Sequence, residues 1–491
     1  MDVLLHGYEV NQPTWFYLSS ILILAVYLRF NRWWSLRNFD LLLILGASPG
    51  LLFLRETEEA WRNVGYAWLF VTSCLFLVRL LLDPLLQRRP YAGQNMNPQG
   101  LAFLCLAAFA FIMSLAITKA PPESTKRTVA EAGNLLTRTA SDAPEQEKTT
   151  RPQDATGEPQ EIAEAPQVAV AETPAVGTDS PEAGAKPQET LAESKEPPAA
   201  EVTPGPAAAV IAAPVGWVFD HLAARILAII GHAAVIIGLW FVGRNLFADN
   251  SLGMGMATLY LLLPCTAYNV GEFNHVLPAA LIVWAFVSYR RPIISGILLG
   301  FACGTMYFPV LLLPLWAAFY GKKGAGRFAI ALVAVAVVLA GSIALTSTDS
   351  DSFVNRTFGT VDFAVLAFFD GEPTTGFWRE SDFHSSYRLP IIVSYFIMLT
   401  TMTILPRRRT VETLLWQSAA AIVGAQLWLT QQGGVYLLWY LPLMLMIMFR
   451  PRLMQVSFAD DPTQIPNTAR SNSPEVGGLT NSRAGSHQLF R

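Results

Sequence analysis

Residues 275–327 read HVLPAALIVWAFVSYRRPIISGILLGFACGTMYFPVLLLPLWAAFYGKKGAGR, and this stretch decides the fold. Its apolar runs have about the length of a membrane span, and each run ends at a cluster of basic residues. The alternation continues along the chain, with basic clusters at Arg29/Arg32/Arg37, Arg88/Arg89, Arg244, Arg290/Arg291, Lys322/Lys323/Arg327, Arg407/Arg408/Arg409 and Arg450/Arg452. The pattern predicts an all-α polytopic integral membrane protein in contact with a lipid bilayer.

The composition supports the same fold class. The chain is 52% hydrophobic and only 14% charged, which is far from the charge content of a soluble domain. Its net charge of −3 is divided between −9 in residues 120–213 and +6 in the remainder. Neither part carries a dense basic stripe, so nucleic acid is excluded as a partner. The four cysteines stand singly inside apolar runs and indicate packing, not a metal site.

A transmembrane helix needs about 20 mostly apolar residues, with about 17 as a working minimum. By this rule we expect about 11 helices, near residues 14–30, 38–54, 65–82, 100–118, 222–243, 252–268, 275–289, 327–346, 389–405, 411–430 and 433–449.

Residues 293–320 need a different interpretation, because this apolar stretch is too long for one helix and has basic residues at both ends. Pro309, with Gly304 just before it, predicts two half-helices at 293–305 and 308–320 that form a hairpin. Glycines at every fourth position, Gly296, Gly300 and Gly304, predict a surface on which another helix packs closely.

The basic clusters also predict the orientation of the chain. If the chain crosses the membrane at each helix, sixteen Lys and Arg fall on one side. Outside residues 120–213, the opposite loops contain only six, which are Arg55, Arg62, Lys119, Arg356, Arg379 and Arg388. By the positive-inside rule the side with sixteen faces the cytoplasm. Because Arg29 follows the first apolar run, we expect a retained helix with an outside N-terminus, in a bacterial inner membrane.

The acidic segment at residues 120–213, which we call the insert, divides the chain into four parts. Residues 1–119 form an N-terminal bundle of four helices, and residues 214–454 form a C-terminal bundle with an extracytoplasmic loop at 347–388. Residues 120–213 contain no Phe, Trp or Tyr and are rich in Pro, Ala and Glu. Since such a segment buries little apolar area, it predicts a disordered extracytoplasmic linker. Residues 455–491 are predicted to be a disordered cytoplasmic tail.

Ionisable residues are scarce within the predicted helices. Arg79 lies four residues before Asp83, where the two can pair, and His232 is expected to be a hydrogen-bonded packing residue. The other candidates gather at the extracytoplasmic edge. The carboxylates proposed as catalytic bases are Glu56, Glu58, Asp370 and Asp382. The side chains proposed to bind substrate are Glu272 and His275 in the turn NVGEFNH, and Arg379, His384 and Arg388 in the aromatic-rich 347–388 loop.

Residues 221–330 and 433–451 resemble polytopic glycosyltransferases of the C superfamily. The resemblance rests on HLAARILAIIGHAAVIIGLWFVGRNLF, on the segment from ATLYLLLPCTAYNVGEFNH to LPLWAAFY, and on GGVYLLWYLPLMLMIMFRP. It implies transfer of a sugar from a polyprenyl-phosphate donor at the extracytoplasmic face. Family members carry a catalytic Asp or Glu in their first outside loop. Here the first loop is basic, and only Glu56, Glu58 and Glu59 occupy a comparable position.

Glycosyl transfer needs a carboxylate base and a group that stabilises the phosphate, which is an arginine or a divalent cation. Two other functions, a scaffold and a transporter, remain open at this point. A non-catalytic scaffold of an envelope complex needs only the acidic linker. Transport is disfavoured because the predicted spans lack midplane charges, although a facilitator of neutral solutes needs none.

Overall fold

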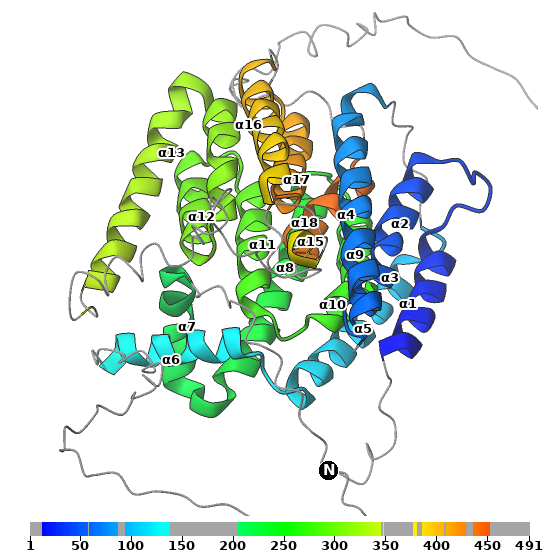
Figure 1. Cartoon of the computed structure of the whole chain (residues 1–491), viewed down its shortest axis with the longest axis horizontal. Helices are drawn as coiled ribbons and strands as arrows, with labels where there is room; N and C mark the ends of the chain where they lie inside the picture. The colour runs from blue at the N-terminus through cyan, green and yellow to red at the C-terminus, as the bar shows by residue number, and fades with distance from the viewer. Residues whose placement is uncertain are drawn as a thin grey trace, which may run out of the picture.

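The structure is a computed structural model that describes residues 12–56, 58–86, 94–137, 205–344, 347, 377–380, 385–406, 409–428 and 436–451. Every regular element in these ranges is a helix (Figure 1). Five helical segments are long and apolar enough to cross a membrane, at Leu36–Phe53, Glu59–Leu81, Pro98–Thr118, Pro206–Asn245 and Phe308–Ala344. The predicted all-α membrane fold is confirmed at this level.

The N-terminal half contains α1 (Gln12–Tyr27), α2 (Leu36–Gly46), α3 (Ser48–Phe53), α4 (Glu59–Leu81) and α5 (Pro98–Thr118). Side chains cap the N-termini of α2 and α5. Ser35 Oγ accepts from Asn38 N, and Asn97 Oδ1 accepts from Gly100 N. The helix predicted at 38–54 is divided into α2 and α3 at Ala47. A short 3₁₀ turn, η1 (Asp83–Leu85), follows α4.

The C-terminal half contains α7 (Pro206–Phe219), α8 (Ala223–Asn245), α9 (Asn250–Leu262), α10 (Pro264–Tyr268), α11 (Phe273–Val287), α12 (Pro292–Thr305), α13 (Leu313–Ala344), α15 (Phe377–Glu380), α16 (Arg388–Ile404), α17 (Val411–Gln426) and α18 (Leu437–Phe449). Short 3₁₀ turns are η2 (Asp220–Leu222), η3 (Phe308–Leu312) and η5 (Ser385–Tyr387). The single helix predicted at 252–268 is interrupted. Leu263 is extended and Pro264 cannot donate a helical hydrogen bond, so α10 starts anew there.

The stretch after α11 folds back on itself. Tyr320 Oη donates to the carbonyl of Tyr289 over 2.8 Å, so the segment 308–320 returns to the level at which α11 ends. At Gly321 the backbone has φ 59° and ψ −165°, a conformation open almost only to glycine, and the chain then continues as the rest of α13. This arrangement agrees with the predicted hairpin of two half-helices.

The glycine repeat lies where α12 packs on α13. A Cβ built on Gly296 would meet Phe328 O at 2.7 Å, and one on Gly300 would meet Val335 Cβ at 3.0 Å. A Cβ on Gly304 would overlap Leu339, one helical turn further on. The prediction of close helix packing at these glycines is therefore confirmed.

Two helices lie in the segment predicted to be disordered, so that prediction is wrong at both ends. They are α6 (Glu123–Thr137) and α7, which begins at Pro206. In Figure 1, α6 runs across the lower end of the helix bundle, next to α7. Both helices bury small side chains in place of aromatic ones. Those with almost no exposure are Thr125, Thr128 and Ala132 on α6 and Ala207, Ala208, Ala209 and Ala212 on α7. Residues 138–204 lie outside the described ranges.

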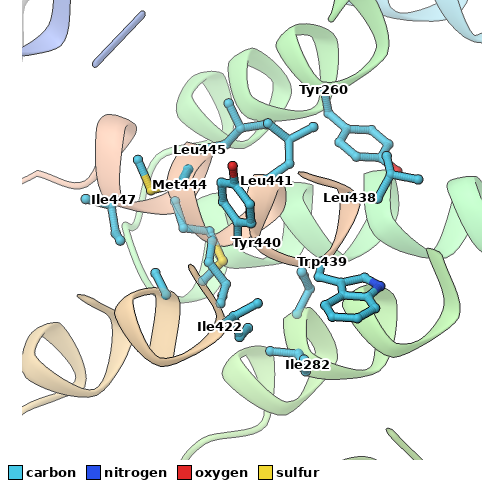
Figure 2. Packing of buried hydrophobic residues seen from close by; sticks show 14 of the residues in the cluster. Tyr260, Ile282, Ile422, Leu438, Trp439, Tyr440, Leu441, Met444, Leu445 and Ile447 are labelled. Atoms are coloured by element: carbon cyan, nitrogen blue, oxygen red, sulfur yellow. The ribbon is translucent and has the colours of Figure 1, made fainter. Parts of the chain in front are cut away.

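The buried core is shared by the two halves of the chain. Every residue of α18 is buried, as expected of a helix that is apolar on all sides. Figure 2 shows Tyr440 of this helix in one cluster with Ile422 of α17 and Ile282 of α11. The N-terminal half reaches the same core, because the Phe76 ring lies 5.5 Å from that of Tyr440.

Candidate functional site at the 269–275 turn

Two predicted site residues, Glu272 and His275, lie in the segment that joins α10 to the first turn of α11, residues 269–275, which we call the 269–275 turn. It follows the break at Pro264 and includes the start of α11 at Phe273. The turn lies against α6, which crosses the same end of the bundle. We call this the α6 end of the molecule, and we call the end that carries Arg79 and Arg450 the arginine end.

Three side chains from separate elements hold the backbone carbonyls of this region. Arg55 Nη2 donates to Tyr268 O over 2.7 Å. His232 Nε2 lies 3.1 Å from Val270 O, and Thr125 Oγ1 donates to Gly271 O over 3.0 Å. Because these groups come from the end of α3, from α8 and from α6, the turn is fixed relative to three helices.

His232 has a partner for each ring nitrogen. Since Val270 O can only accept, Nε2 carries the proton and donates to it. Nδ1 then accepts from Tyr260 Oη, 2.9 Å away. Both rings are fully buried. His232 is thus the hydrogen-bonded packing residue that the sequence predicts.

The polar side chains of the turn bind mainly to α6. Ser124 Oγ donates to Glu272 Oε2 over 3.2 Å. Asn274 is held on both sides, because its Oδ1 accepts from Thr128 Oγ1 at 2.9 Å and its Nδ2 donates to Ser124 O at 3.0 Å. α6 therefore orients the carboxylate of Glu272 directly.

One cation lies close to this carboxylate, and a second cation lies close to the first. The Arg55 guanidinium stacks on the Tyr268 ring at 5.1 Å, and Glu272 is near enough to oppose the lowering of the Arg55 pKa by burial. Burial lowers the pKa of Lys119 as well, and the positive charge of Arg55 lowers that pKa further. The α6 end thus holds two mutually repelling cations, of which Arg55 lies near a carboxylate, and the repulsion between the cations favours an anionic ligand.

His275 faces the interior from the first turn of α11. Its Nδ1 accepts from Trp439 Nε1 over 3.0 Å, and the two rings are stacked. An indole N–H only donates, so Nδ1 is unprotonated and His275 is neutral with its proton on Nε2. Phe308 stacks on Trp439 with ring centroids 4.0 Å apart. His275 is thus part of a stack of three aromatic rings.

Arg388 lies apart from the turn and caps α17. Its Nη2 donates to Trp428 O over 3.0 Å, and Trp378 Nε1 donates to Leu427 O over 3.0 Å. The last carbonyls of a helix carry partial negative charge and lack helical partners, so a guanidinium and an indole N–H both suit this position. Arg388 is 2% exposed and donates to this helix end, which indicates a structural role.

The structure places the other predicted residues as follows. Glu56 and Glu58 are exposed beside Arg55, at the α6 end. Asp370, Asp382 and His384 lie outside the described residues, as does the side chain of Arg379. Within the described ranges, no group of three or more His, Cys, Asp or Glu side chains is arranged to hold a metal ion.

Sequence reasoning missed the hydroxyl groups of α6 and the part played by Arg55. Ser124, Thr125 and Thr128 lie in a segment without aromatic residues, which made it resemble a linker. Ser124 and Thr125 each lie about one helical turn before Thr128, and this spacing just after Pro121 and Pro122 is the signal that could have indicated a helix. From the sequence, Arg55 and Lys119 were recognised only as two of the six basic residues on the predicted extracytoplasmic side.

The sequence matches no family model, no curated protein and no solved structure.

Proposed function

We propose that this chain is a membrane glycosyltransferase that moves a sugar from a polyprenyl-phosphate donor to an envelope acceptor at the α6 end. The observation that supports it is the position of Glu272. This carboxylate is oriented by Ser124 and lies near Arg55, which in turn interacts with Lys119. A base and a phosphate-binding pair are the two groups that such a transfer requires.

In the proposed reaction Glu272 removes the proton from the acceptor hydroxyl. The acceptor oxygen forms a bond to the anomeric carbon of the sugar as the bond from that carbon to the phosphate oxygen breaks. The electron pair stays on the polyprenyl phosphate, whose charge Arg55 and Lys119 stabilise. A lipid-linked phosphate would reach these cations at the edge of the bilayer, where both follow apolar helices long enough to span it.

The proposal includes the orientation of the chain. The α6 end faces the extracytoplasmic side of a bacterial inner membrane, and the arginine end faces the cytoplasm. The excess of sixteen Lys and Arg over six supports this assignment. The count of eleven spans belongs to the same proposal, since the five long apolar helices are joined by shorter ones such as α11, α16 and α18.

The test is sugar transfer by the purified chain in vesicles that contain a polyprenyl-phosphate hexose and a lipid or glycan acceptor. Glu272→Gln keeps the shape and should lower kcat about 100-fold or more, as loss of a general base does. Arg55→Gln and Lys119→Gln should raise the KM for the donor. Glu123→Gln, which changes an exposed carboxylate of α6 that pairs with Lys126, is the matched control and should leave the rate unchanged.

Two results would exclude the proposal. If Glu272→Gln transfers sugar as fast as wild type, Glu272 is not the base. If the wild-type chain turns over no lipid-linked sugar and a deletion strain has an unchanged envelope glycan profile, the chain is not a glycosyltransferase.

A scaffold is the second candidate function. It is favoured by the hydrogen bonds that already join α6 to the 269–275 turn. Thr125, Thr128 and Ser124 bond to the turn in a way that would simply dock α6, from which the acidic insert continues. A scaffold predicts that deletion of residues 138–204 abolishes function while Glu272→Gln has no effect. A glycosyltransferase predicts the reverse.

A further inference from the structure

The connection between α1 and α2 lies at the edge of the bundle in Figure 1. It exposes aromatic side chains. The exposed fractions are 53% for Phe30, 66% for Trp33 and 103% for Trp34. Phe30 and Trp33 form an edge-to-face pair with centroids 6.2 Å apart. Several large apolar side chains exposed together mark a contact surface.

This connection is held in one shape by a buried asparagine. Asn38 is 1% exposed, and its Nδ2 donates to Arg29 O at 3.0 Å and to Arg32 O at 3.1 Å. Its Oδ1 accepts from Arg29 N at 2.9 Å. Ser35 Oγ closes the loop by capping α2. The aromatic side chains are therefore presented by a fixed backbone, which lowers the entropic cost of binding.

The surface continues onto the sides of the two helices. Phe39 and Leu42, one turn apart on α2, are 51% and 54% exposed, and Leu18 and Ile21 on α1 are 55% and 67% exposed. Exposed apolar side chains on apolar helices form the lipid-facing surface of a membrane protein. The loop thus begins where the lipid-facing surface ends.

The charge of the loop is positive. Arg29 is half-buried and Arg32 is exposed, and residues 28–39 contain no Asp or Glu. The third arginine, Arg37, is directed inward, with its guanidinium 5.1 Å from the Phe449 ring. Trp and Arg side chains are typical of the end of a membrane helix, where it meets the lipid headgroups. The arginines favour anionic lipids.

We propose that the α1–α2 loop is a binding site for the headgroups of anionic phospholipids. The indoles of Trp33 and Trp34 insert at the level of the lipid glycerol, and Arg29 and Arg32 bind the phosphates. This site is at a different end of the molecule from Glu272, and it holds whether or not the chain transfers sugars.

The test uses the full chain with Asn31→Cys, labelled with an environment-sensitive fluorophore and reconstituted in phosphatidylcholine vesicles. Signal from the native cysteines is subtracted with the labelled wild-type chain. Spin-labelled phosphatidylglycerol should quench the fluorophore more than spin-labelled phosphatidylcholine at the same mole fraction. Replacing Arg29 and Arg32 by Gln should remove this preference. Each replacement should lower the affinity for phosphatidylglycerol relative to phosphatidylcholine about fivefold.

Two further variants make the result specific. Trp33→Ser with Trp34→Ser should reduce quenching by both lipids, because the loop no longer inserts. Lys126→Gln with Arg127→Gln, which removes two charges from α6, is the matched control and should change nothing. Elution volume and unfolding temperature confirm that each variant is folded.

Equal quenching by the two lipids would overturn the proposal, because the site would not select anionic headgroups. Quenching by aqueous iodide with none by either lipid would overturn it as well, since the aromatic surface would then stand in water and suit a protein partner.

Discussion

Asp83 and Arg450 form a buried ion pair across 367 positions of the chain, with Arg450 Nη2 at 2.9 Å from Asp83 Oδ2. Both side chains are at most 2% exposed. The other carboxylate oxygen of Asp83 accepts from Arg79 Nη1 at 3.0 Å, and Arg79 forms two hydrogen bonds to Asp40. Arg450 also pairs with Glu412. Charges of alternating sign thus connect α2 and α4 to α17 and α18 at the arginine end.

Removal of one partner from this network should destabilise the fold strongly. Asp83→Asn leaves two buried guanidinium groups without their shared carboxylate, and breaking a buried pair costs about 3–5 kcal/mol. The measurement is the unfolding temperature of the purified protein in detergent. Glu123→Gln is the control, because the exposed pair of Glu123 with Lys126 contributes about 0–1 kcal/mol. Equal shifts for the two variants would contradict this prediction.

The contact between α12 and α13 should tolerate no added methyl group. Gly296→Ala would place a Cβ 2.7 Å from Phe328 O, which is backbone and can move only with its helix. We expect a loss of about 1–3 kcal/mol in the free energy of unfolding. Gly326→Ala, in α13, is the matched control. Open space surrounds that position, so the variant should be neutral or more stable by about 0.5–1 kcal/mol.

Local signals were enough to predict this helix contact and the pairing of Arg79 with Asp83. Glycines at intervals of four and a charge pair at i and i+4 define one face of one helix, wherever the rest of the chain lies. The Pro309 break and the return of the chain by Tyr320 are local as well. The fold class follows from the length of the apolar runs.

The rest depends on contacts between distant segments. Asp40, Asp83 and Arg450 become one network only when α18 packs against α2 and α4, and no spacing in the sequence indicates that contact. α6 was missed for a different reason. Its buried face consists of Thr and Ala, whose small area fails a test based on aromatic content. Close packing and hydrogen bonds to the 269–275 turn supply the stabilisation that area does not.

Removal of the Arg55 charge should raise the pKa of Lys119. Burial lowers this pKa from 10.5 first, and repulsion by Arg55 lowers it further, so Arg55→Gln reverses only the second part. The measurement is the pH dependence of reductive methylation at Lys119, followed by mass spectrometry. Arg127→Gln serves as the control. A Lys119 titration that is the same in wild type and in Arg55→Gln would show that the two cations do not interact.

The same shift has a consequence for stability. The folded protein disfavours protonated Lys119, so at neutral pH this residue lowers the free energy of unfolding. The loss disappears as pH rises through the folded pKa toward 10.5. The contribution of Lys119 to the free energy of unfolding should therefore increase with pH in this window. Arg55→Gln should make that increase smaller.

Docking of α6 should depend on its two buried hydroxyl groups. Thr125→Val and Thr128→Val keep the shape of the side chain but leave Gly271 O and Asn274 Oδ1 without these donors, at about 1–3 kcal/mol each. Amide hydrogen exchange should accelerate in residues 123–137 while α12 and α13 stay protected, because only the local unit opens. Lys126→Ala, on the exposed face of the helix, should leave the exchange pattern unchanged. Faster exchange throughout the chain would show instead that α6 is part of the global folding unit. If α6 opens alone, the proposed sugar transfer should fall with it, since Ser124 then no longer orients Glu272.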